Sequence, residues 1–198
     1  HHMLYLIGDA TARSAVPIQV QAGLYRAHKI ENYDTAFVRC TVAGGAQVFF
    51  AVSHACALED FTEFSFEFEK GTVAYRTSGE IAGTLADGTR RSYGPGRHDG
   101  DCKVLDTVTA VAEGREPLCG IEAALSHTMC INAAQESGEP VVDISGEVTG
   151  TTEFKGEPYL NVRGLDDVMK EAFRTVSVPD SSLAPWARAG RVIELGRH

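Results

Sequence analysis

The chain has 198 residues, of which 43% are hydrophobic and 23% are charged, and its formal net charge is −9. The length allows one large domain or two small ones, and the composition excludes a disordered or fibrous protein. The excess of acidic residues argues against nucleic acid as a partner, because phosphate neutralisation requires clustered Lys and Arg. No apolar run approaches the roughly 20 residues of a membrane-spanning helix, and the start lacks the features of a signal peptide. The sequence therefore predicts a cytoplasmic protein that binds neither nucleic acid nor a membrane.

Alternation of apolar and polar residues with a period of two dominates the first half of the chain. The predicted strands cover residues 16–24, 36–42, 46–52, 64–68, 72–76, 81–85 and 89–93. Gly44 and Gly45 separate two of these runs, which is a hairpin signal. Phe64, Phe66 and Phe68 alternate with polar residues in the clearest strand. Together the runs predict a large, mainly antiparallel sheet with one polar face.

The apolar pattern changes to a helical period in the second half of the chain. Helical stripes run over 105–112, over 121–133 with an end at Gly138, and over 165–173. Residues 141–144 and the ambiguous segment 148–162 lie between the last two stripes. Strands followed by helices predict an α+β fold with the helices packed on one face of the sheet. No repeat or linker divides the chain, so a single domain is expected over 15–198.

Several nucleotide-binding and catalytic motifs are absent from the sequence. There is no G-x-G-x-x-G, no P-loop, no G-x-S-x-G and no H-E-x-x-H, and Gly94-Pro95-Gly96 reads as a turn. The five cysteines are far apart and form no C-x-x-C pair, which is typical of scattered thiols in a reducing compartment rather than of a zinc site. The sequence therefore predicts neither a cofactor site nor a metal site within these residues.

His54 is the most prominent candidate site residue. It continues the apolar face of Val48, Phe50 and Val52 to the rim of the predicted sheet, where it is either a hydrogen-bonded structural residue or a substrate contact. A second candidate is the run Arg97-His98-Asp99, which either binds an anionic or hydroxylated ligand or forms a solvated loop and helix cap.

Three further groups of ionisable residues have weaker signals. Tyr25, Arg26 and His28 form a candidate cluster at the end of the first strand. His127 reads as a packing residue. The acidic residues of the 63–69 strand read as a solvated or charge-protected sheet face.

The order of these segments resembles the C-terminal domain of the Gfo/Idh/MocA family of NAD(P)-dependent oxidoreductases. Residues 4–8 resemble the end of the helix that bears the family's catalytic His, and residues 33–53 resemble its first hairpin. Residues 66–73 and 106–143 resemble the strands and paired helices that follow, and 134–141 fit an A-x-x-S-G-x-P-V pattern. Residues 185–195 resemble the family's C-terminal tail.

The resemblance implies a glyceraldehyde-3-phosphate dehydrogenase-like C-terminal domain without its Rossmann domain. Residues 1–14 would then be a remnant of the inter-domain helix and connector, with tag residues at 1–3, and the family's catalytic His would precede His1. No catalytic residue carries over to this chain. The resemblance further implies that NAD or NADP binds the full-length parent and that His54, Arg97 and His98 orient a sugar-like substrate. A homodimer or higher homo-oligomer through the sheet is also implied.

Two other functions stay open at this point. The chain could be a stand-alone α+β binding or scaffold protein, or a hydrolase or isomerase that uses His54 or His98. The residues encoded upstream of Leu4 would separate the first of these from a dehydrogenase domain. Loss of activity in a folded His54→Ala variant would identify the second.

Overall fold

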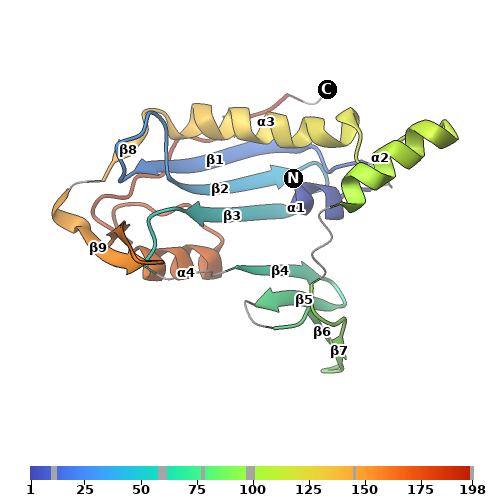
Figure 1. The fold of residues 1–198 in the computed structure, drawn as a ribbon, viewed down its shortest axis with the longest axis horizontal. Coiled ribbons are helices and arrows are strands. Elements are labelled where there is room, and N and C mark those ends of the chain that lie inside the picture. Colours follow the sequence, from blue (N-terminus) through green and yellow to red (C-terminus); the bar gives the residue numbers. More distant parts are fainter. Residues whose placement is uncertain (10–12, 58–61, 77–78, 97–100, 145, 197–198) are drawn as a thin grey trace. The chain divides into compact units, whose positions relative to one another are not determined.

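The computed structural model describes residues 1–9, 13–57, 62–76, 79–96, 101–144 and 146–196, and it has an α+β architecture (Figure 1). The chain forms two compact units. The main unit comprises His1–Ala57 and Thr107–His198, and the inserted unit comprises Leu58–Asp106. The single domain over 15–198 that the sequence predicts stays a prediction. No helix in the described part of the chain is long and apolar enough to cross a membrane.

A five-stranded sheet forms the centre of the main unit. Its strands are β1 (Pro17–Arg26), β2 (Thr35–Val42), β3 (Gln47–Ser53), β8 (Val142–Asp143) and β11 (Ile193–Glu194). β1, β2 and β3 pair antiparallel in chain order. Gly44 and Gly45 form the turn between β2 and β3 with φ of 100° and 88°, values that glycine adopts without strain. The second edge of β1 is shared by β11, which pairs antiparallel, and by β8, which pairs parallel at the end of β1.

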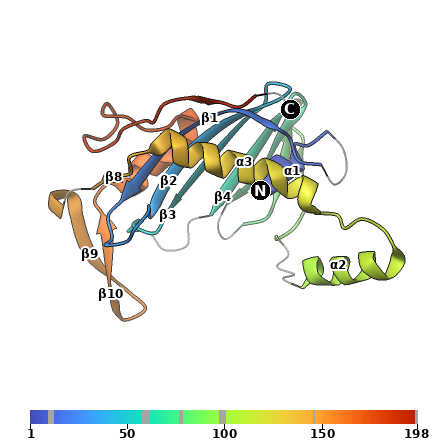
Figure 2. The ribbon, with the colours of Figure 1, turned by 90° about the horizontal axis from the view of Figure 1, so that it is seen from above.

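The helix α3 (Ile121–Gly138) covers one face of this sheet (Figure 2). Even-numbered residues of β1 point to this face, because side chains alternate along a strand. The buried side chains of this layer include Val20, Ala22, Leu24, Cys40, Ala133 and Ala134. The short helix α1 (His2–Leu6) contacts α3, and α2 (Cys102–Glu113), whose residues belong partly to each unit, precedes α3 in the chain.

The second face of the sheet is also covered, by α4 (Leu165–Thr175) and the C-terminal segment that follows it. Its buried side chains include Tyr25, Phe37, Leu165, Val168, Ala172 and Ala187. The α+β class and the mainly antiparallel pairing predicted from the sequence are confirmed. The expectation of one polar sheet face differs from the structure, because Tyr25 of β1 and Phe37 of β2 are buried on this second face.

A two-stranded hairpin of β9 (Thr149–Phe154) and β10 (Glu157–Val162) follows the short 3-10 helix η1 (Gly146–Val148). The N–H of Val162 donates to the carbonyl of Ala55 at 2.9 Å. This bond joins the hairpin to the segment after β3, so that β10 lies at the end of the five-stranded sheet.

The inserted unit is a four-stranded antiparallel sheet in chain order. Its strands are β4 (Glu63–Phe68), β5 (Gly71–Arg76), β6 (Ala82–Leu85) and β7 (Arg90–Ser92). The rings of Phe64 and Tyr75 stack across β4 and β5 with centroids 5.5 Å apart. The strands that were expected in one large sheet are thus divided between the five-stranded sheet, which contains β1 to β3, and the inserted unit, which contains β4 to β7.

Candidate functional site

Asp34 is a buried carboxylate at the end of the five-stranded sheet, where the loop after β1 enters β2. Its side chain is 3% exposed, and its Oδ2 accepts the backbone N–H groups of Ala27 and His28, each at 2.8 Å. The hydroxyl of Thr35 donates to Oδ1 at 3.0 Å. Burial raises the pKa of Asp34, but the hydrogen bonds from His28, Ala27 and Thr35 together outweigh burial, so the pKa lies below its usual range. Asp34 is therefore an ionised carboxylate that fixes the loop.

His28 is oriented by this carboxylate. Its ring Nδ1 lies 2.8 Å from Oδ2 of Asp34. An ionised carboxylate can only accept a hydrogen bond, so Nδ1 carries the hydrogen and Nε2 is the basic nitrogen of the neutral ring. The side chain is 31% exposed, and no hydrogen bond within the described residues engages Nε2. A carboxylate that holds an imidazole through Nδ1 is an arrangement used in general acid–base catalysis. His28 can therefore exchange a proton at Nε2, or accept a hydrogen bond there from a hydroxyl group.

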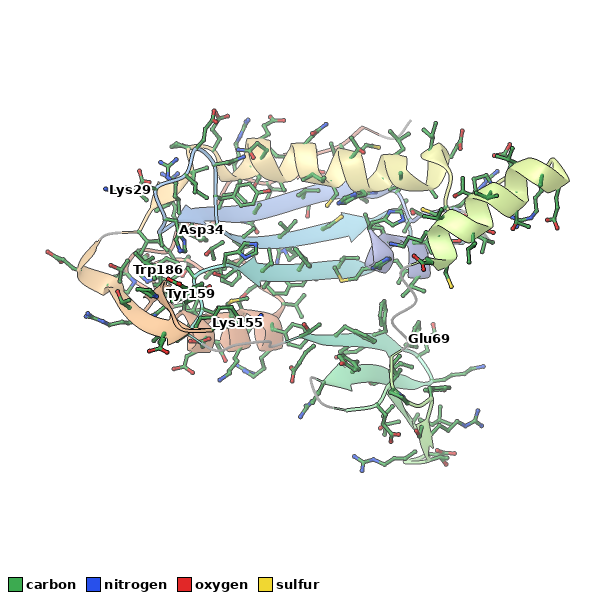
Figure 3. The ribbon with its side chains drawn as sticks, viewed as in Figure 1. Lys29, Asp34, Glu69, Lys155, Tyr159 and Trp186 are labelled. Atoms are coloured by element: carbon green, nitrogen blue, oxygen red, sulfur yellow. The ribbon has the colours of Figure 1, made fainter. Side chains whose placement is uncertain are left out.

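Tyr159 of β10 borders His28 from the hairpin. The two ring centroids are 6.4 Å apart, and the Tyr159 hydroxyl donates to the carbonyl of His54. Burial and the neighbouring Cys56, Asp34 and Asp166 raise the pKa of Tyr159, so the phenol stays protonated at neutral pH. Figure 3 shows Asp34 and Tyr159 at the same end of the sheet.

Two hydroxyls extend the polar arrangement across the strand ends. Thr35 Oγ1 and Ser53 Oγ are 2.8 Å apart, at paired positions of β2 and β3. Ser53 Oγ also accepts the N–H of Ala55 at 2.8 Å. The connected side chains, here named the His28 cluster, are His28, Asp34, Thr35, Ser53 and Tyr159.

Cys56 lies beside the His28 cluster and is not an activated nucleophile. Burial, together with the charge of Asp166, raises the pKa of Cys56 to about 11. Its Sγ donates to Sδ of Met169 at 3.1 Å. Thiol reactivity requires the thiolate, so Cys56 is a neutral packing residue at pH 7. Within the described residues, no group of three or more His, Cys, Asp or Glu is arranged to hold a metal ion.

His54, the principal sequence candidate, follows β3 directly and has an exposed side chain. Its backbone joins the His28 cluster: the N–H donates to the carbonyl of Asp34 at 2.9 Å, and the carbonyl accepts the Tyr159 hydroxyl. A substrate contact by the His54 side chain stays a prediction. Arg97 and His98 lie outside the described residues.

The candidate group of Tyr25, Arg26 and His28 is separated by the structure. Tyr25 is fully buried in the core, and Arg26 forms an ion pair with Asp143 at 2.7 Å. Of the three, only His28 belongs to the His28 cluster. Sequence reasoning missed Asp34 as a site residue, although its place just before a predicted strand was a signal. Tyr159 had no signal, because it comes from the segment whose structure the sequence left ambiguous.

Comparisons with known proteins find likeness in structure and not in sequence. No family model and no curated protein matches this chain. The UDP-N-acetylglucosamine 3-dehydrogenase of Acidithiobacillus ferrooxidans matches with a TM-score of 0.52 and 16% identity, over 64% of this chain and 41% of that chain. An oxidoreductase from Agrobacterium radiobacter, solved with NAD+, L-tartaric acid and magnesium, matches with a TM-score of 0.53 and 19% identity, over 63% and 42%. The aldose–aldose oxidoreductase of Caulobacter crescentus matches with a TM-score of 0.51 and 16% identity, over 63% and 39%.

These matches show a shared fold. They confirm, at the level of the fold, the predicted resemblance to oxidoreductases of the Gfo/Idh/MocA type. The chain spans about two fifths of the length of these solved structures.

Proposed function

We propose that this chain forms the C-terminal substrate-binding and oligomerisation domain of an NAD(P)-dependent oxidoreductase that acts on a sugar or polyol. The observation that carries the proposal is the fold shared with the two sugar oxidoreductases described above, over about two fifths of their length. NAD or NADP would bind a part of the parent outside this chain, because these residues contain no glycine-rich strand–helix motif. The chain alone would then be inactive.

The His28 cluster would orient the substrate. Oxidation of an alcohol moves a hydride from carbon to the nicotinamide and a proton from the hydroxyl to a base. Nε2 of His28 can accept a hydrogen bond from a substrate hydroxyl, because Asp34 holds the hydrogen of the ring on Nδ1. His54, Arg97 and His98 remain the further contacts predicted from the sequence.

Oligomerisation through the sheet is supported by the surface of β3. Phe50 and Val52 of this strand are 46% and 38% exposed, and within the described residues β3 pairs only with β2. An exposed apolar strand at a sheet edge is a site of association with another copy. We expect a dimer in sedimentation velocity and a monomer for Phe50→Ser combined with Val52→Ser. Val192→Ser, which alters a 43% exposed apolar residue elsewhere, is the matched control. A monomeric native chain would contradict this part of the proposal.

Substrate binding is tested by NMR of the histidine rings during titration with hexoses and polyols. We expect the Nε2 resonance of His28 to shift saturably, and the shift pattern to disappear in His28→Ala. His127→Ala, in which an exposed histidine of α3 is removed, should bind like the native chain. If no sugar or polyol perturbs His28, its role as a substrate contact is wrong. Saturable fluorescence binding of NADH by these residues alone would overturn the assignment of the cofactor to another domain.

A stand-alone binding or scaffold protein is the second candidate. It is favoured by α2, on which Val104, Leu105, Val108 and Val111 are 62–79% exposed. The gene sequence upstream of Leu4 separates the two functions. A G-x-G-x-x-G after a strand, together with the E-K-P triplet that carries a catalytic lysine in the Gfo/Idh/MocA family, would settle the choice for the dehydrogenase, whereas a native start codon at Met3 would favour the scaffold.

A further inference from the structure

The C-terminal segment between α4 and β11 carries a hollow that shares no residue with the His28 cluster. Its volume is about 480 Å³, within the range of roughly 300–1,000 Å³ found for small-molecule sites. Val142 of β8 forms part of its wall, and the rest comes from the segment itself, including Asp180, Ser181, Trp186 and Arg188. Figure 3 shows Trp186 near the same end of the sheet as Asp34.

The walls of this hollow are held in place by the hydroxyl of Tyr25. This hydroxyl, fully buried, donates to the carbonyl of Arg188 at 3.0 Å and lies 3.3 Å from the carbonyl of Pro179. The residues on both sides of the loop 180–187 are thereby fixed to β1. The ring of Trp186 packs edge-on against Tyr25, with centroids 5.2 Å apart and an angle of 82°. The site is therefore formed before any ligand arrives, which lowers the entropic cost of binding.

The polar groups of the hollow carry opposite charges. Asp180 accepts the N–H and the hydroxyl of Ser182 through Oδ1, at 2.9 and 2.6 Å, and these bonds keep it ionised. Arg188 donates one N–H to the carbonyl of Pro140 at 3.0 Å, and a guanidinium has five N–H donors in total. The charges of one carboxylate and one guanidinium sum to zero, so a charged ligand gains little electrostatic binding free energy from the site. A neutral ligand that both donates and accepts hydrogen bonds can use both groups.

We propose that this hollow binds the ring of a neutral monosaccharide or cyclic polyol, with its C–H face on Trp186 and its hydroxyls on Asp180 and Arg188. Such a ring presents an apolar face of C–H groups and a rim of hydroxyls, and the indole and the two charged side chains complement these features. The proposal goes beyond the proposed function: it adds a second sugar site, and it stands even if the chain has no dehydrogenase partner.

Trp186 is the only tryptophan of the chain, so tryptophan emission, excited at wavelengths where the tyrosines do not absorb, reports on this site alone. We expect a saturable change of its emission on titration with glucose or myo-inositol. Arg188→Ala and Asp180→Asn should each weaken binding about tenfold, as expected for loss of a charged hydrogen bond. Asp180→Asn retains an oxygen for Ser182, so the loop should stay folded, and circular dichroism checks this. Arg191→Ala is the matched control: Arg191 pairs with Glu136 at 2.7 Å outside the hollow and should leave binding unchanged.

Three results would overturn the proposal: no saturable emission change with any neutral sugar or polyol, unchanged affinity in folded Asp180→Asn, or tighter binding of glucuronate or glucosamine than of glucose. His28→Ala separates this proposal from the proposed function. It should leave the Trp186 titration unchanged, whereas it should abolish the NMR response of the His28 cluster. Each site can therefore fail without the other.

Discussion

The hydroxyl of Ser137 accepts the backbone N–H of Ala22 at 2.8 Å, so that a helix side chain serves as the hydrogen-bond partner of β1 between β11 and β8. The same hydroxyl donates to the carbonyl of Arg191, and the carbonyl of Ala22 accepts the N–H of Gly190 at 2.8 Å. At this point no strand of the described residues lies on that edge of β1. α3 and the C-terminal segment satisfy the backbone groups that a strand would otherwise pair.

Ser137→Ala should lower the free energy of unfolding by about 1–3 kcal/mol. The substitution leaves the buried N–H of Ala22 and the carbonyl of Arg191 without this partner, and an unsatisfied buried group carries the full desolvation cost. Urea unfolding followed by circular dichroism measures the change. Ser181→Ala, at an exposed position of the C-terminal segment, should change stability by less than about 0.5 kcal/mol. Equal effects of the two variants would show that the Ser137 hydroxyl is not a stabilising partner.

Gly138→Ala should destabilise the main unit although alanine favours helices. A Cβ at Gly138 would lie 2.4 Å from Leu24 Cγ and 2.8 Å from its Cδ1. Overpacking of this kind costs about 1–3 kcal/mol, against roughly 1 kcal/mol gained in helix propensity. The double variant with Leu24→Ala provides the control, because removal of the Leu24 side chain relieves the clash. Additive effects of the two substitutions in chemical denaturation would contradict the predicted contact.

Asp34→Asn should remove a contribution to the free energy of unfolding that the native chain loses at low pH. The folded pKa of Asp34 lies below its usual value of about 3.9, so its contribution is present above that pH and is lost as the pH falls through the folded pKa. At pH 7 the variant should be less stable by about 1.5–3 kcal/mol, the value of hydrogen bonds to a charged group. Urea titrations should show this difference in the free energy of unfolding at pH 7 and a smaller difference below pH 3. Asp9→Asn, at an exposed position, should show neither.

Tyr25→Phe should loosen the loop 180–187 and change stability at alkaline pH. Burial raises the pKa of Tyr25 to about 12 from 10.0. The native chain therefore loses this contribution as the pH rises from about 10 towards 12, because tyrosinate forms more readily in the unfolded chain. At pH 7 the free energy of unfolding of the variant should be about 1 kcal/mol lower, because one hydrogen bond is missing. Between pH 10 and 12 the variant should not show the further decrease that ionisation of Tyr25 causes in the native chain. Thermal unfolding at pH 7 to 11 tests this, with Tyr33→Phe as the control; identical alkaline profiles of native chain and Tyr25→Phe would refute it.

Local patterns in the sequence were sufficient for β1 to β7 and for α2 to α4, but not for β9 and β10, whose segment they left ambiguous. The run 46–52 became β3 at Gln47–Ser53, and the predicted end of a helix at Gly138 matches the end of α3. The distribution of strands over three sheets was not predictable from local pattern, because β4 to β7 carry the same alternation whichever sheet they join. The second apolar face was not predicted because the apolar pattern follows the even-numbered residues of each strand, whereas Tyr25 and Phe37 are odd-numbered residues.

Only the part of the candidate site that is formed by residues close together in the sequence was predictable. His28 and Asp34 lie on one loop, and a histidine followed closely by an aspartate before a strand could have been recognised as a pair. Tyr159 reaches His28 across more than a hundred residues, through the Val162–Ala55 bond. His54 was singled out from its face on β3, yet that face is half exposed, and the structure brings only the backbone of His54 into the cluster.

The pairing of β1 with β11 sets the order in which this chain can mature on the ribosome. Gln19 Nε2 donates to Glu194 Oε1 at 2.8 Å across a sequence separation of 175 residues. The part of the β1 edge that pairs with β11 thus stays open until residue 194 has been synthesised, and closing a loop of this length is entropically slow. Nascent chains stalled before residue 193 should accordingly be captured by chaperones that bind exposed strand edges, and shortening the chain at its end should harm folding more than shortening the hairpin β9–β10.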